Sequence, residues 1–142
     1  MRLVIQTNIP GQLEIWVLDS ARRVLAHKTA RIQFHGSDQL LELVDRTLRG
    51  ARLGWADIRG IAVVRGPGPF TAVRTGVIVG NTLAMLLRIP VVGMIRPESI
   101  TKDTISQIPW PKKQPGKFIR PSYGREPNIT KPRAKARTLA RA

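Results

Sequence analysis

Few residues in this sequence are of a type that does covalent or metal chemistry. The chain has no cysteine, which excludes disulfides and thiolate metal sites. Its two histidines, His27 and His35, stand apart from paired carboxylates, so we expect solvated or hydrogen-bonded imidazoles rather than metal ligands. The serines lie outside any nucleophile-elbow motif. We therefore expect neither a metal site nor a catalytic residue.

One motif has the residue types of a phosphate site: Gly66-Pro67-Gly68-Pro69, immediately before an apolar segment with helical spacing. Backbone amides at a helix N-terminus can bind phosphate. Two of these four residues are prolines, which lack the amide hydrogen, and no lysine follows as it does in a P-loop. The motif is better explained as a rigid structural turn that sets a strand against a helix.

Positive charge is concentrated toward the C-terminus. Residues 1–100 hold 13 Lys or Arg and 7 Asp or Glu, a net +6, whereas residues 101–142 hold 11 and 2, a net +9. The second segment is also rich in proline, so we expect it to be extended when free. Such charge favours RNA or another polyanion, and the alternative is a solubilising tail without a fixed partner.

The candidate RNA contacts in this tail are basic residues with one aromatic residue among them, whose ring could stack on a base. They are Lys112, Lys113, Lys117, Arg120, Tyr123 and Arg125. The alternative is that the tail docks on its own domain.

Hydrophobic periodicity predicts the element order βββαβαβ. Segments 3–7, 12–18 and 23–29 fit three strands joined by short turns, which favours an antiparallel meander. A helix is then expected to start at Ser37 and to end near Gly50. Segment 60–64 fits a buried parallel strand. A second helix over 70–87 and a last strand over 90–95 are expected to follow. This order predicts an α/β fold, with one ribonuclease-H-like lobe of the actin, sugar kinase and chaperone superfamily at residues 1–102. An extended basic tail is expected at 103–142.

The stretch from Arg65 to Gly76 resembles the "GRGPGSFTGLRIG" signature of the TsaB family, also called YeaZ. Residues 89–93 (IPVVG) match the family's "IPVVGV" strand, and residues 121–127 are similar to its closing "P-YLR" segment. The resemblance implies a cytoplasmic, non-catalytic partner of the TsaD enzyme in threonylcarbamoyladenosine synthesis on tRNA, with no cofactor of its own.

Two departures from the family pattern stand out. The family opens with a strand like "ILAIDTS", and its Asp and Ser positions are Gln6 and Asn8 here. In catalytic relatives that Asp lies near nucleotide phosphate and metal, and a neutral glutamine is a poor magnesium ligand. Family members also have a second lobe before the closing segment, where this chain has only residues 103–117. We therefore expect no ATPase cleft in this chain alone.

Small residues recur every four positions in the predicted 70–87 helix, at Ala72, Gly76, Gly80 and Ala84. A glycine inside a helix costs about 1 kcal/mol against alanine, which is explained if another backbone approaches closely. In the family, this helix and the 37–50 helix pair with the equivalent helices of TsaD, or with a second copy. The alternative is that the stripe packs against the chain's own sheet.

The residues expected at this partner surface are apolar or small and lie on the two helices. They are Leu40, Leu41, Val44, Leu48, Val73, Gly76, Val77, Gly80 and Ala84.

The sequence thus predicts a scaffold subunit that holds a TsaD-type enzyme in an active conformation. Its rivals are a stand-alone RNA-binding or ribosome-associated protein and a residual ATPase or kinase-like enzyme. No membrane association is expected, because the longest apolar stretch, Val77 to Leu87, is short and interrupted by Gly80, Asn81 and Thr82.

Overall fold

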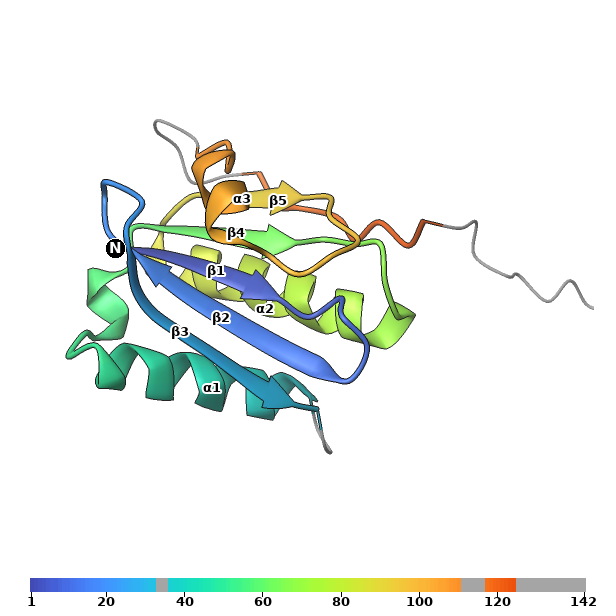
Figure 1. Cartoon of the computed structure of the whole chain (residues 1–142), viewed down its shortest axis with the longest axis horizontal. Helices are drawn as coiled ribbons and strands as arrows, with labels where there is room; N and C mark the ends of the chain where they lie inside the picture. Colours follow the sequence, from blue (N-terminus) through green and yellow to red (C-terminus); the bar gives the residue numbers. More distant parts are fainter. Residues whose placement is uncertain (33–35, 111–116, 125–142) are drawn as a thin grey trace, which may run out of the picture.

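A five-stranded sheet forms the centre of the protein in the computed structural model, which describes residues 1–32, 36–110 and 117–124. In chain order, the strands are β1 (Arg2–Gln6), β2 (Gln12–Leu18), β3 (Val24–Arg31), β4 (Gly60–Val64) and β5 (Val91–Met94). The helices are α1 (Gly36–Gly50), α2 (Phe70–Leu87) and the short α3 (Lys102–Ser106), with a 3-10 turn at Trp55–Asp57. The predicted βββαβαβ order is confirmed, and α3 follows it (Figure 1).

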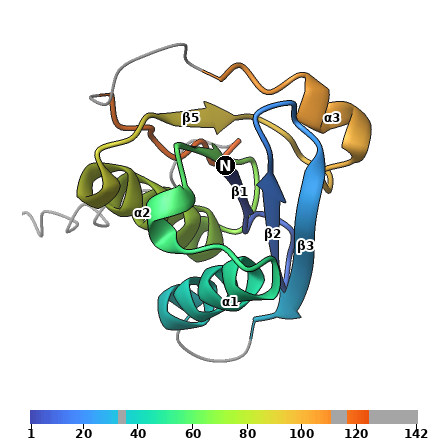
Figure 2. The ribbon, with the colours of Figure 1, turned by 90° about the vertical axis from the view of Figure 1, so that its left-hand side faces the viewer.

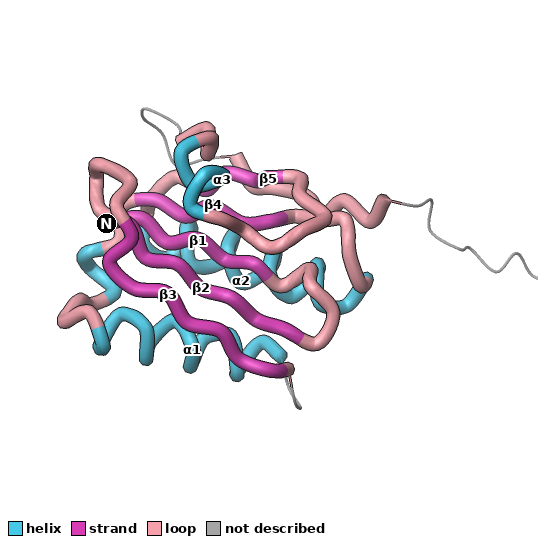
Figure 3. Tube along the Cα trace, viewed as in Figure 1, coloured by secondary structure: helices cyan, strands magenta, loops and turns pink. Residues whose placement is uncertain are grey.

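The strands are ordered β3-β2-β1-β4-β5 across the sheet. β1, β2 and β3 form the predicted antiparallel meander, in which Val4 lies opposite Trp16 and Trp16 lies opposite His27. β4 pairs in parallel with both β1 and β5. Because β1, β4 and β5 run in the same direction, the loops that follow them gather at one edge of the sheet (Figure 3).

Helices α1 and α2 lie side by side on one face of the sheet, and α3 lies on the other (Figure 2). Alternation along each strand divides the apolar side chains between these layers. Leu3, Ile5 and Ile15 join the larger core beneath α1 and α2, whereas Val4 and Ala62 pack with Ile105 of α3. Strand β4, an interior strand between β1 and β5, is buried along its whole length, as its uniformly apolar sequence predicts.

The lobe continues past residue 102, where the extended tail was expected to begin. α3 starts there with a capping box between Thr101 and Thr104, and Ile105 and Ile108 are almost fully buried against the sheet. The expectation of an extended segment directly after residue 102 is therefore corrected. Residues 111–116 and 125–142 lie outside the described residues.

Candidate functional site

Helix α2 turns its small residues toward the chain's own sheet. A Cβ added at Gly76 would overlap the Oγ1 of Thr7, and one added at Gly80 would overlap the Cγ2 of Val63. The glycines are therefore needed because β1 and β4 approach the helix closely, and not because a partner backbone does. The expectation that this stripe faces a partner is corrected, and the alternative of packing on the sheet holds.

The same correction applies to most of the expected partner surface. Leu40, Val44, Leu48, Val73, Gly76, Val77, Gly80 and Ala84 are all buried inside the lobe. Of the expected residues, Leu41 is exposed, at 38%. The physical reason is that a helix on a two-layer lobe must bury its main apolar stripe against the sheet.

A second set of apolar side chains, which the sequence reasoning missed, lies on the outside of the helix pair. Ile78 is 55% exposed although its neighbours Val77 and Val79 are buried, and Leu86 is also exposed. Leu41 on α1 is exposed as well, and these three side chains are here called the outer helix surface. The sequence does contain a signal for these exposed residues, because the α2 segment is apolar on more than one face of the helix.

Among the helices that the structure describes, α2 has a length and an apolar composition that would allow it to cross a membrane. In this fold it packs mainly against β4, with Val73 and Val77 in the core, as a core helix does.

The Gly66-Pro67-Gly68-Pro69 turn packs against two other segments of the chain. The side-chain amide of Asn8 donates to the carbonyl oxygen of Pro67 at 2.8 Å. Gly66 has a φ of 131°, a left-handed conformation that favours glycine, and a Cβ there would overlap the carbonyl oxygen of Ser122. The turn thus holds β1 and the closing segment together, which supports its interpretation as a rigid structural link.

Gln6, at the position of the family's aspartate, is fully buried and hydrogen-bonded at both ends of its amide. Its Nε2 donates to the carbonyl oxygen of Glu98 at 2.8 Å and to Asn8 Oδ1 at 3.0 Å, while its Oε1 accepts from the backbone N–H of Ile100 at 2.9 Å. Asn8 also donates to the carbonyl oxygen of Arg96 at 2.7 Å. Two neutral amides therefore fasten the loop after β5 to the end of β1.

A histidine and a buried glutamate form a close pair across β2 and β3. His27 Nε2 lies 2.6 Å from Oε1 of the buried Glu14, and the imidazole stacks on Trp16 with a centroid distance of 3.6 Å. The hydrogen-bonded histidine that we expected is confirmed at His27, while His35 lies outside the described residues. Within residues 1–32, 36–110 and 117–124, no three His, Cys, Asp or Glu side chains group closely enough to hold a metal ion.

The closing segment, residues 117–124, docks on its own lobe along α2. The side-chain amide of Asn81 donates to the carbonyl oxygen of Ile119 at 2.9 Å and accepts from its N–H at 3.0 Å. The N–H of Ser122 donates to the carbonyl oxygen of Arg65 at 2.6 Å. The Tyr123 ring stacks on Phe70 with a centroid distance of 4.2 Å.

The predicted RNA contacts are therefore placed in part. Lys117 and Arg120 are exposed on the closing segment, whereas Tyr123 is half-buried on Phe70. Lys112, Lys113 and Arg125 lie outside the described residues. Phe118, 63% exposed, is an aromatic residue of this segment that the sequence reasoning missed.

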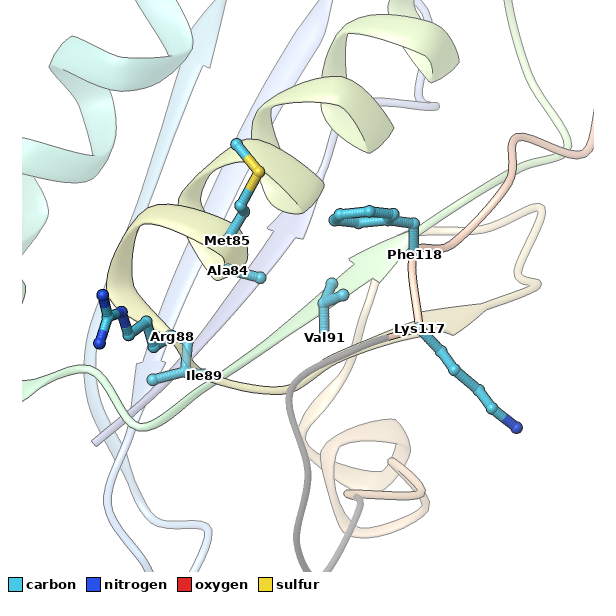
Figure 4. A pocket seen from close by; sticks show the side chains of 7 residues that line it. All are labelled: Ala84, Met85, Arg88, Ile89, Val91, Lys117 and Phe118. Atoms are coloured by element: carbon cyan, nitrogen blue, oxygen red, sulfur yellow. The ribbon is translucent and has the colours of Figure 1, made fainter.

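An apolar groove of about 260 Å³ lies where the closing segment meets the end of α2 (Figure 4). Its apolar lining comes from Ala84, Met85, Ile89, Val91 and Phe118. The Phe118 ring points toward α2, while the side chains of Arg88 and Lys117 point away from the groove at its two sides. The groove therefore combines an exposed aromatic ring with two nearby cations.

The fold and these surfaces define a ribonuclease-H-like α/β lobe in which neutral amides join the loops after β1 and β5, and several apolar helix residues are exposed. The family model of TsaD, tRNA N6-adenosine threonylcarbamoyltransferase, matches residues 24–107, more than half of the chain. The chain belongs to this family. A tRNA N6-adenosine threonylcarbamoyltransferase of Syntrophotalea carbinolica is 48% identical over 52 residues, which are 37% of this chain and 15% of that protein.

Solved structures similar to this chain confirm its resemblance to YeaZ. YeaZ from Pseudomonas aeruginosa is 28% identical with a TM-score of 0.59, over 66% of this chain and 44% of that one. A protein described as uncharacterized, with similarity to peptidase YEAZ from Pseudomonas aeruginosa, is 28% identical with a TM-score of 0.60, over 66% and 42%. The chain thus spans less than half of these structures and about one seventh of the curated relative.

Proposed function

We propose that this chain is a non-catalytic, cytoplasmic scaffold subunit that supports a TsaD-type enzyme in threonylcarbamoyl transfer to a tRNA adenosine. The observation that carries the proposal is the outer helix surface: Leu41, Ile78 and Leu86 are apolar, exposed and borne by the two helices that lie side by side on the sheet. Helices with exposed apolar side chains on a small lobe favour a protein partner. That partner is the TsaD-type catalytic subunit, or a second copy of this chain when it is alone.

Catalysis is assigned to the partner because this lobe lacks the charged group at the end of β1. Both the nitrogen and the oxygen of the Gln6 amide are hydrogen-bonded, to the backbone of residues 98–100 and to Asn8, so neither atom is available to a metal ion. A second lobe has no room between α3 and the closing segment, since only residues 107–116 separate them. ATP, metal and the acyl intermediate then belong to the partner, and this chain acts as one lobe with a basic tail.

The energetic case rests on the few residues that a partner would cover. Full burial of a side chain such as isoleucine or leucine contributes about 1.5–3 kcal/mol. Three such residues on one surface can therefore supply a large part of the free energy of a specific interface, whose energy is concentrated in a few central residues.

The test is co-purification with the TsaD-type enzyme of the same source, with the complex sized by light scattering. We expect a one-to-one complex that Ile78→Glu or Leu41→Glu abolishes while the circular dichroism melting curve stays unchanged. The matched control is Leu25→Glu, because Leu25 is likewise an exposed leucine, at 42%, but lies on β3 and not on α1 or α2. A complex that survives both helix variants refutes the proposed surface, and a lone monomer in every sample refutes the scaffold role.

The rival favoured by a specific observation is a stand-alone RNA-binding protein, since the net charge is +15. It predicts RNA binding with steep salt dependence and no complex with a TsaD-type enzyme. The same co-purification separates the two.

A further inference from the structure

We propose that the closing segment and the adjoining side of α2 form a binding strip for single-stranded RNA. This inference rests on the proposed function only for the identity of the RNA as a tRNA. The surface itself is built from residues other than the outer helix surface.

The strip is held in place by hydrogen bonds that leave its side chains free. Asn81 fixes the backbone of Ile119 from both sides, and the N–H of Ser122 donates to the carbonyl oxygen of Arg65. Arg120 uses only its carbonyl oxygen, which accepts from the Arg65 guanidinium at 3.4 Å, and its own side chain is exposed. The segment is thus a fixed platform along α2.

Aromatic rings are exposed at both ends of this platform. Near the C-terminal end of α2, Phe118 forms one wall of the groove beside Met85 and is 63% exposed (Figure 4). Near the N-terminal end, Phe70 remains 51% exposed although Tyr123 stacks on it. Nucleobases stack on exposed aromatic rings whatever their sequence, and can extend an existing stack.

Cations accompany each aromatic group. The Arg74 guanidinium lies 5.5 Å from the centre of the Phe70 ring, and Arg88 and Lys117 flank the groove at Phe118. Arg120 lies between the two ends along the chain. None of these cations is paired with a described carboxylate.

Carboxylates are also absent from the segments that build the strip. Residues 58–97 and 104–125 contain no Asp or Glu, so all nine acidic residues of the chain lie elsewhere in the sequence. Segments that carry several cations and no carboxylate favour a polyanion, because each phosphate that is neutralised releases counterions. A protein partner would not require this exclusion of carboxylates.

Geometry favours a single strand. Phe70 and Met85 are 15 residues apart on α2, which is about 22 Å at 1.5 Å per residue. Two stacking positions at that separation, with cations between them, suit a strand of a few nucleotides whose bases are unpaired. The bases of a duplex are already stacked on one another and cannot reach the rings.

The experiment measures fluorescence anisotropy of the full chain with a labelled RNA hairpin whose loop has seven nucleotides, and with a fully paired RNA of equal length. We expect tighter binding of the hairpin. Phe118→Ala should weaken hairpin binding about 5- to 160-fold, the loss of one stacked base. Arg120→Gln should reduce the slope of log affinity against log salt by about 0.7, the loss of one contact to a single strand.

The matched control is Arg46→Gln, which removes an exposed cation from α1 and should change neither quantity. Thermal melting of each variant checks that the fold is kept, as expected for exposed side chains. Equal affinity for hairpin and duplex, or unchanged hairpin binding in both Phe118→Ala and Arg120→Gln, overturns the inference. If Phe118→Ala loses binding to the TsaD-type partner but keeps RNA binding, the inference is also overturned, and the strip is instead a protein-binding surface. Failure of the proposed scaffold role appears separately, in the co-purification of Ile78→Glu.

Discussion

Replacing Gly80 by alanine separates two explanations of the small-residue stripe on α2. Helix propensity alone predicts that the variant is more stable by about 1 kcal/mol. The structure predicts the opposite, because the new Cβ would overlap Cγ2 of Val63. Val63 is fully buried on the interior strand β4, and a β-branched side chain in a close-packed core has little freedom to rotate away.

The magnitude follows from these two opposing terms. Overpacking a core by one methyl group costs about 1–3 kcal/mol, from which the propensity gain of about 1 kcal/mol is subtracted. We expect a net destabilisation of about 1 kcal/mol, which lowers Tm by about 3–5 °C in a domain of this size. Val63→Ala alone should cost about 2 kcal/mol by leaving a cavity. In the double variant the new methyl fills part of that cavity, so the two effects should differ from additivity by at least 1 kcal/mol, in the stabilising direction.

Thermal and urea unfolding of the four proteins, followed by far-ultraviolet circular dichroism, measures this cycle. Thr82→Ala on the exposed side of α2 is the control, because it should stabilise by a few tenths of a kcal/mol through propensity alone. A higher Tm for Gly80→Ala, or strict additivity with Val63→Ala, would refute the conclusion that the stripe is packed against β4.

Two further predictions test the loops and the pH dependence. Gln6→Leu should lower the free energy of unfolding in urea by about 3 kcal/mol, because the N–H of Ile100 and the carbonyl of Glu98 lose their partner in a buried site. The control Gln12→Leu, at the half-exposed start of β2, should change this free energy by less than about 0.5 kcal/mol. Similar effects for both variants would contradict the clamp. Hydrogen bonds from the backbone N–H of Arg23, and then from its guanidinium, lower the pKa of Asp19 below its ordinary value of 3.8. The ionised carboxylate therefore stabilises the fold above pH 3.8, and this stabilisation is lost as the pH falls through the folded-state pKa. Urea midpoints between pH 7 and pH 3 should therefore fall more steeply in the native chain than in Asp19→Asn, and parallel curves would contradict this assignment.

Much of the architecture could be predicted from local patterns. Alternation in β2, the uniformly apolar β4 and the glycine-proline turn before α2 were enough for the element order and for the resemblance to YeaZ. Helix α3 lies in the segment that was expected to be extended, because a five-residue helix among proline and lysine has almost no periodicity. The burial of Ile105 and Ile108 depends on the sheet face that they cover.

The candidate site, too, could be predicted only in part from local patterns. The sequence identified α1 and α2 as the surface-forming helices, but placed the partner contacts on residues that the lobe buries. Val77 and Ile78 are equally apolar neighbours in the sequence, yet one is 3% and the other 55% exposed. Which of them faces outward depends on the rotation of α2 about its axis, and that rotation is set by the fit of Gly76 and Gly80 against Thr7 and Val63.

The order of the elements, the concentration of positive charge and the absence of acidic residues from 58–97 can be read from the sequence, because they follow from composition and local spacing. The roles of Gln6 and Asn8 as clamps, and the stacking of Tyr123 on Phe70, depend on tertiary contacts. The position of Phe118 beside Met85 depends on them as well. Each of these contacts joins residues more than 30 positions apart, and such pairings are fixed by the packing of strands and helices and not by any local preference.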